Sequence, residues 1–203
     1  MQIAYNKSKR TEKIRYIVIH DTGNKSRGAD ARAHFNYFNS GDRQSSADFF
    51  ADDKECLKVN DYNTYYTWHC GDGKGKNGIT NNNSVGVEIC INSDGNYEKA
   101  KENALKTVRL LMNELGVPPE RVVRHFDVSG KNCPQTFSES DWKSFKNALI
   151  DEYTDIETIV STLAQRGIVT DKEGMIKEMK ENPNGRLYWL ARKTLTALRR
   201  AGA

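Results

Sequence analysis

The sequence contains no run of apolar residues close to the ~18 that a membrane-spanning helix needs. Its N-terminal segment, MQIAYNKSKRTEKIRY, is basic but lacks the apolar stretch of a secretory signal. Internal repeats and low-complexity tracts are absent as well. These absences predict a protein that does not insert into a membrane, is made in a cytoplasm, and stays there unless another factor releases it.

A strong charge of one sign is also missing. The 31 Lys and Arg residues exceed the 27 Asp and Glu residues by only four, which gives a net charge of +4. This excess is too small to indicate nucleic-acid binding, although it suits weak attraction to an anionic polymer. With 37% hydrophobic and 29% charged residues, the chain has the balance of a folded domain and not of a disordered one.

Cysteine is scarce, with four residues in the chain: Cys56, Cys70, Cys90 and Cys133. Four cysteines could form two disulfides. In the reducing compartment expected here, free thiols or metal ligation are favoured instead.

Strand patterns alternate with helical patterns along the first three quarters of the chain. The run RYIVIH over residues 15–20 is apolar and β-branched, which is typical of a buried strand. In VGVEICI over residues 85–91, the valines and isoleucines share one face and Glu88 points to the other. Further predictions are a strand hairpin over 48–59, a strand over 122–128, helices over 29–38 and 97–115, a helix capped by Ser138, and a Gly/Asn-rich loop over 71–83. The alternation predicts an α/β fold with a mixed central β-sheet flanked by helices.

The pattern changes after Tyr153. Capping boxes at Thr154 and Thr170, and a turn over 182–185, separate three short amphipathic patterns. We therefore divide the chain into a main domain, residues 1–153, and a three-helix module, residues 154–203. A module of about fifty residues has a marginal core. We expect it to pack on a partner, on a copy of itself or on the main domain.

Three residues have the chemistry of zinc ligands. His20 ends a predicted strand, His125 lies on the predicted strand 122–128, and Cys133 follows it in the next loop. A catalytic zinc ion takes three such ligands and keeps a fourth position for water. The spacing leaves other interpretations open: polar histidines with a small core cysteine, or a closed structural zinc site completed by Cys70 or Cys90.

Other residues fit a reaction at such a metal. Glu88 is placed to act as a base, unless it is a solvated acid on an edge strand. Lys131, close to Cys133 in the chain, can direct a cation at an oxyanion, or be an ordinary surface lysine. Trp68 and His69 suit contact with sugar or peptide, or are a packed tryptophan and a solvated histidine.

Five motifs occur in a characteristic order. They are IVIHDTG (17–23), SADFFADDKE (46–55), TWHCGD (67–72), NNNSVGVEIC (81–90) and RHFDVSGKNCP (124–134). On these motifs, residues 10–150 resemble the zinc N-acetylmuramoyl-L-alanine amidases, the type that shares its fold with peptidoglycan recognition proteins. Endolysins of phages that infect Gram-positive bacteria are similar in particular.

The resemblance implies a peptidoglycan hydrolase that cleaves the amide bond between N-acetylmuramic acid and L-alanine. It implies that His20, His125 and Cys133 bind Zn²⁺ and that Glu88 and Lys131 are catalytic. Trp68, His69 and Asn83 are then expected to contact the substrate. The enzyme would be made in the host cytoplasm and reach the wall after a holin releases it. The C-terminal module would bind the wall or form a homo-oligomer.

Two positions depart from the family pattern. Asp48 stands where the family usually has His, and Ala47 where some members carry a catalytic Tyr. A mechanism that depends on Tyr is therefore not expected, and proton transfer falls to Glu88. The alternative function is a non-catalytic peptidoglycan-binding protein of the same fold. Cys133 argues against it, because receptor-type members typically lose that ligand.

Overall fold

The computed structural model describes residues 1–71, 77–151, 156–182 and 185–200. The strands are β1 (Lys7–Lys9), β2 (Tyr16–Asp21), β3 (Phe49–Ala51), β4 (Cys56–Lys58), β5 (Tyr65–Thr67), β6 (Ser84–Ile89) and β7 (Val122–Arg124). The helices are α1 (Ala31–Asn39), α2 (Tyr97–Leu115), α3 (His125–Ser129), α4 (Glu139–Asp151), α5 (Ile156–Gln165), α6 (Lys172–Glu181) and α7 (Arg186–Arg200), with short 3-10 turns η2 (Asn81–Asn83) and η3 (Pro119–Arg121).

The central sheet is mixed, as the sequence predicts. Its strand order is β4-β3-β6-β2-β7, with β3–β4 antiparallel and the other pairs parallel. A separate antiparallel ribbon pairs β1 with β5. The sequence analysis missed this ribbon because its strands have three residues each and β1, Lys-Ser-Lys, has no apolar pattern.

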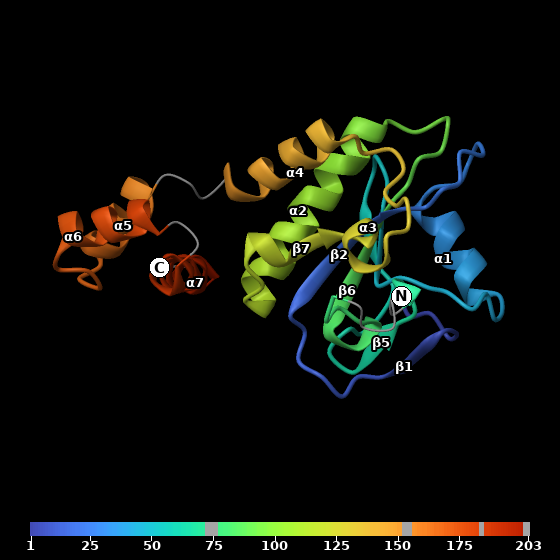
Figure 1. The fold of residues 1–203 in the computed structure, drawn as a ribbon, viewed down its shortest axis with the longest axis horizontal. Helices are drawn as coiled ribbons and strands as arrows, with labels where there is room; N and C mark the ends of the chain where they lie inside the picture. Colours follow the sequence, from blue (N-terminus) through green and yellow to red (C-terminus); the bar gives the residue numbers. More distant parts are fainter. Residues whose placement is uncertain (72–76, 152–155, 183–184, 201–203) are drawn as a thin grey trace.

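The two faces of the sheet have different environments. Val85, Val87 and Ile89 of β6 pack against α2 in the main core, together with Ile17 and Ile19 of β2. On the opposite face, α1 covers the β3 end, where Phe50 and Cys90 are buried in a smaller cluster. Figure 1 shows α2 and α4 on one side of the sheet and α1 on the other. Between α1 and α3, the centre of this second face carries the polar residues of β2 and β6.

Helix α2 matches its prediction at both ends. The side chain of Asn96 caps the first turn by accepting a hydrogen bond from the backbone N–H of Lys99. Gly116 ends the helix at φ 67°, a left-handed conformation that glycine adopts at little cost. Ala104, Val108 and Met112 are fully buried on the predicted face. The hairpin over 48–59 and the helix that begins after Ser138 are likewise confirmed.

The strand prediction for residues 122–128 is wrong beyond Arg124. The Asp127 carboxylate accepts a hydrogen bond from the Arg124 N–H at 2.8 Å, which caps the first turn of α3. Gly130, at φ 80°, ends this helix after five residues. His125 is therefore the first residue of a helix and does not lie on a strand.

The cap predicted at Thr170 is also wrong by one residue. Asp171 is the N-cap of α6, and its carboxylate accepts a hydrogen bond from the Gly174 N–H at 2.9 Å. Aspartate is at least as favourable as threonine at the N-cap position. The cap predicted at Thr154 lies outside the described residues, and so does the centre of the predicted turn over 182–185.

The three predicted C-terminal helices are present and share a small apolar core. Its buried residues are Ile159, Val160, Leu163, Met179, Tyr188 and Ala191. Helix α7 also contacts the main domain, because Trp189 packs against the main core. Figure 1 shows α5, α6 and α7 grouped at one side, with α7 nearest α2. Among the described residues, no helix is long and apolar enough to cross a membrane.

We propose that residues 1–153 fold without the helical module, because the main core draws almost all of its residues from positions 14–149. Removing the half-buried Trp189 contact is expected to cost about 1–2 kcal/mol. At this chain length that loss lowers Tm by roughly 2–8 °C. Thermal unfolding of the 1–153 fragment should show one cooperative transition, and full-length Trp189→Ala should show a similar small decrease. A fragment that aggregates or melts without cooperativity would place the boundary elsewhere.

Candidate metal centre and active site

The three predicted metal ligands meet in space. His20 Nδ1 lies 3.1 Å from His125 Nδ1 and 3.7 Å from Cys133 Sγ. The three donor atoms all lie within 4.8 Å of one another, and all three residues are buried. They form the metal-ligating cluster found among the described residues, and neither Cys70 nor Cys90 is part of it.

The backbone brings these residues together from distant positions. Ile19 of β2 pairs with Arg124, the last residue of β7, so His20, the next residue of β2, lies beside His125, the first residue of α3. The loop that carries Cys133 is held at two points. The Phe126 N–H donates to the Cys133 carbonyl at 2.9 Å, and the Asp21 carboxylate accepts from Thr136 N–H at 2.9 Å.

The donor set fits a zinc ion. Bonds of about 2.0–2.1 Å to nitrogen and about 2.3 Å to sulfur put tetrahedral N···N and N···S pairs about 3.3 and 3.6 Å apart. The observed separations, 3.1 and 3.7 Å, are close to these values. Burial, with His69 and His125 nearby, keeps the pKa of His20 well below its usual range. Burial and then Lys131 lower the pKa of His125 to about 4. Both rings are therefore neutral, the form that binds metal.

Each histidine in the donor set uses its second ring nitrogen in a buried hydrogen bond. His125 Nε2 lies 3.1 Å from the Cys70 carbonyl oxygen, and His20 Nε2 lies 3.1 Å from His69 Nδ1. Such outer partners fix the orientation of metal-binding imidazoles. His69, predicted to contact substrate, is 7% exposed, and its Nδ1 lies within hydrogen-bond distance of the predicted metal ligand His20. Burial, followed by His125 and Arg10, lowers the pKa of His69 to about 3.

Glu88 lies beside this cluster. It is the register partner of His20 on the central strand β6, which excludes the interpretation as a solvated edge-strand acid. Its Oε2 atom is buried and has no hydrogen-bond partner among the residues that the structure describes. Burial raises the pKa of Glu88 to about 8; Asp21 adds to this, and Lys131 opposes it. A carboxyl group that titrates near neutral pH can both accept and return a proton.

A cavity of about 360 Å³ opens beside the cluster. Trp68, His69, His125 and Lys131 are among the residues that line it. Lys131 is exposed, and Trp68, 39% exposed, is held at the rim by a 3.1 Å hydrogen bond from Nε1 to Ser8 Oγ on β1. Three protein ligands beside an open cavity are typical of a catalytic metal site.

Asn83 lies in the turn before β6 and is only 1% exposed. Its Oδ1 accepts from the Thr80 N–H and its Nδ2 donates to the Gly78 carbonyl, both at 2.9 Å. Both ends of the amide therefore stabilise the turn. A direct contact between Asn83 and substrate stays an untested prediction.

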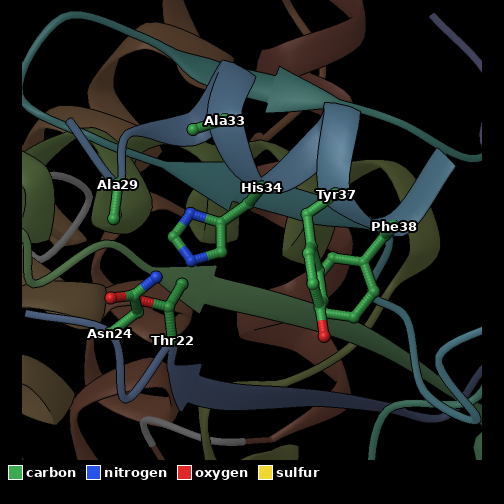
Figure 2. A pocket seen from close by; sticks show the side chains of 7 residues that line it. All are labelled: Thr22, Asn24, Ala29, Ala33, His34, Tyr37 and Phe38. Atoms are coloured by element: carbon green, nitrogen blue, oxygen red, sulfur yellow. The ribbon is translucent and has the colours of Figure 1, made fainter. Parts of the chain in front are cut away.

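A second cavity, of about 290 Å³, was not predicted. Figure 2 shows it between α1 and the segment after β2, lined by Thr22, Asn24, Ala29, Ala33, His34, Tyr37 and Phe38. His34 Nδ1 lies 2.8 Å from the Asp30 carbonyl oxygen, and Thr22 Oγ1 is buried with no partner among the described residues. The signal that could have indicated this cavity is the polar turn after His20 followed by an aromatic-rich helix.

The two departures from the family pattern are buried. Ala47 is 1% and Asp48 0% exposed. The Asp48 carboxylate accepts from Asn60 Nδ2 at 2.7 Å, Thr67 Oγ1 at 2.9 Å and the Gly86 N–H at 2.8 Å. Asp48 therefore stabilises the sheet from inside and is not exposed to a substrate.

The comparison with known proteins agrees with this arrangement. The family model described as N-acetylmuramoyl-L-alanine amidase matches residues 10–136, which contain all three donor residues and Glu88. The chain belongs to this amidase family.

Relatives of the amidase family match the same part of the chain. The N-acetylmuramoyl-L-alanine amidase CwlH of Bacillus subtilis is 39% identical over 137 residues, which is 66% of this chain and 52% of CwlH. The chain thus spans about half the length of this curated relative. The solved catalytic domain of XlyA, a Bacillus subtilis amidase, is 38% identical with a TM-score of 0.65, covering 71% of this chain and 91% of that domain. A mutant endolysin from Bacillus subtilis is 39% identical with a TM-score of 0.65, covering 71% and 90%.

Among the described residues, Cys56, Cys70, Cys90 and Cys133 form no disulfide. This agrees with the expectation that the first three are not paired in disulfides, and their state as free thiols stays a prediction. Burial, then Glu88, raises the pKa of the Cys133 thiol to about 12, and a bound cation would reverse this effect.

Replacing Asp48 by Asn should destabilise the protein by about 1–3 kcal/mol, because one buried donor loses its acceptor. Asn60 cannot compensate by rotating its amide, since its Nδ2 also donates to the Tyr65 carbonyl at 2.9 Å. Urea unfolding measures the change. Asp42→Asn is the matched control at an exposed carboxylate that also accepts two hydrogen bonds. Equal stability of the two variants would contradict the assignment.

Proposed function

We propose that this chain is a zinc-dependent peptidoglycan hydrolase that cleaves the amide bond between N-acetylmuramic acid and L-alanine. The observation that carries the proposal is the buried His20–His125–Cys133 cluster beside the unpartnered carboxyl of Glu88, in a chain of the amidase family. The names of CwlH and XlyA supply the bond. Because the chain spans only part of these relatives, their activity is a proposal for this chain.

Zinc would be held by His20, His125 and Cys133, where it would polarise the scissile carbonyl and lower the pKa of a water molecule. Glu88 is the base that takes a proton from the attacking water. The water oxygen bonds to the lactyl carbonyl carbon, and the C–N bond then breaks as Glu88 returns the proton to the leaving nitrogen. The products are a lactyl carboxylate and a free L-alanyl amino terminus.

Two further residues act on the substrate in this proposal. Lys131 lines the same cavity as His125, so its ammonium group can stabilise negative charge that develops on the carbonyl oxygen. The exposed Trp68 ring at the cavity rim offers an apolar surface for a sugar ring.

We further propose that residues 154–203 hold the enzyme on the cell wall, which it reaches after release by a holin. This segment has nine basic and six acidic residues, so it carries three of the four net positive charges of the chain. Such an excess of positive charge favours binding to an anionic polymer. The 1–153 fragment should then cleave soluble muropeptides like the full chain but sediment less with intact walls. Equal sedimentation, or a full chain that runs as a dimer while the fragment does not, would assign the module to another task.

Purified protein should contain about one zinc ion per chain, because three ligands of the preferred types are in place. Elemental analysis measures the content. Cys133→Ser should lose most of the zinc and the activity, and strong chelators should inactivate the wild type. The control is Cys56, the half-buried cysteine of β4, which lies outside the cluster: Cys56→Ser should keep its zinc. Wild-type activity that persists without zinc would overturn the zinc requirement.

Glu88→Gln should retain zinc and fold but lose about 10²- to 10⁴-fold in turnover, the range that general-base catalysis commonly contributes. Mass spectrometry of digested cell wall gives the measurement, as the rate at which free L-alanyl amino termini appear on intact glycan strands. Glu102→Gln, an exposed change on α2, should behave like the wild type. A near-normal rate for Glu88→Gln would mean that another group takes the proton.

A further inference from the structure

The hydrogen bond of His125 fixes which of its ring nitrogens can bind a metal. Its Nε2 faces the Cys70 carbonyl oxygen at 3.1 Å. A carbonyl oxygen only accepts hydrogen bonds, so Nε2 must carry the proton. The lone pair of the neutral ring is therefore at Nδ1, the atom that faces His20 and the donor cluster.

For His20, the direction of its hydrogen bond with His69 is determined by a series of contacts that ends at the Thr80 carbonyl. His20 Nε2 lies 3.1 Å from His69 Nδ1, and this pair alone does not show which nitrogen donates. His69 Nε2 lies 3.1 Å from Ser84 Oγ, which donates to the Thr80 carbonyl at 2.5 Å. A hydroxyl has one proton, so Ser84 must accept the hydrogen bond from His69.

The remaining assignments follow in order. His69 carries its proton at Nε2, which leaves a lone pair at Nδ1. That lone pair accepts the proton of His20 Nε2, and the His20 lone pair is then at Nδ1, in the donor cluster. A main-chain carbonyl thus sets the tautomer of each ligand histidine, directly for His125 and through two side chains for His20.

We propose that His69 is a positioning residue that fixes the tautomer and ring orientation of His20, and that Gly86 leaves the space that the His69 ring occupies. The proposal rests on the proposed zinc site and adds to it a residue that does not itself bind the metal.

The need for this space explains why Gly86 stands in the middle of the central strand β6. A Cβ atom at Gly86 would lie 2.6 Å from Cγ and 2.9 Å from Cβ of His69, closer than real side chains approach. Gly86 is also held in place, because its N–H donates to the buried Asp48 carboxylate at 2.8 Å. Glycine is required here for space, since any side chain would displace the His69 ring from His20.

One side chain holds the backbone of both orienting residues. Asn81 Oδ1 accepts from the His69 N–H at 3.0 Å and from the Cys70 N–H at 2.9 Å. His69 orients His20 through its ring, and Cys70 orients His125 through its carbonyl. The segment 80–84 therefore determines the geometry of both ligand histidines.

The test measures zinc affinity of the metal-free full-length protein by competition with a chromophoric chelator. His69→Phe keeps an aromatic ring and removes the acceptor, so zinc affinity should fall about 10- to 100-fold, the usual effect of losing an outer partner. His69→Asn, which can place an amide oxygen near the Nδ1 position, should recover most of the loss. The visible spectrum of the Co²⁺-loaded protein should change in His69→Phe and return in His69→Asn.

Two smaller changes test the same chain of contacts. Gly86→Ala removes no polar group and should weaken zinc binding only because the added methyl group displaces the His69 ring. Ser84→Ala should weaken it less than His69→Phe. Ser46→Ala is the matched control, because Ser46 is also a buried hydroxyl that donates to a main-chain carbonyl at 2.5 Å, on Asn6, and it accepts from the Trp68 N–H at 3.0 Å, with no hydrogen bond to the His69 ring among the described residues. Its zinc affinity should equal that of the wild type.

Wild-type affinity and an unchanged Co²⁺ spectrum in His69→Phe would overturn the proposal. If His69→Phe does not fold, Gly86→Ala decides: unchanged zinc affinity overturns the proposal, and weakened affinity beside an unaffected Ser46→Ala supports it. A wild-type protein that binds no zinc would instead refute the proposed function, so the two failures are distinguishable.

Discussion

The parallel pairing of β2 with β6 at the centre of the sheet is the constraint on which the site depends. Ile17 and Ile19, with Val85 and Val87, must face α2 to be removed from water. Because side chains alternate along a strand, this burial turns His20 and Glu88 to the opposite face, side by side in register. A slip of one residue would exchange the two faces and remove both the core and the site. The hydrophobic core therefore sets the relative position of a predicted metal ligand and the proposed base.

The second face must satisfy the polar groups that this arrangement buries. An unpaired buried donor or acceptor costs about 1–3 kcal/mol. The protein meets this demand with main-chain carbonyls and short side chains: Asp48, Asn81 and Ser84 each make several of the contacts that hold the site. Glu88 Oε2, Thr22 Oγ1 and Asn60 Oδ1 are exceptions among the described residues, because each is buried with no hydrogen-bond partner there. The two histidines predicted to bind the metal thus each use their second ring nitrogen in a hydrogen bond, whereas the carboxyl group proposed to move protons has an unpaired oxygen among the described residues.

Two charges act on that group in opposite directions. The Asp21 carboxylate, which accepts hydrogen bonds from Thr136, favours protonated Glu88, and Lys131 favours the ionised form. Asp21 follows His20 in the chain and also fastens the loop that carries Cys133. The same residue therefore positions a predicted metal ligand and raises the pKa of the proposed base, which couples the shape of the site to its proton chemistry.

The sequence by itself determined the elements whose patterns are long and local. The apolar runs of β2 and β6 and the full length of α2 follow from side-chain periodicity, and the donor types at positions 20, 125 and 133 indicate zinc. Short elements could not be predicted from the sequence. Asp127 and Gly130 turned the predicted strand after Arg124 into α3, and β1 and β5 are too short to show a period.

Only the tertiary structure decided what the buried polar residues do. His69 and Asn83 share motifs with residues of the cleft, yet one contacts His20 and the other closes a turn. Asp48 departs from the family pattern and is paired with groups from three other segments. The hydrogen-bond partners of His69 and Asp48 named here lie 12 to 49 positions away in the chain, so no local pattern specifies them; only the partner of Asn83 is local. Periodicity records which face a side chain takes, but only the packing of distant segments determines which atom it meets there.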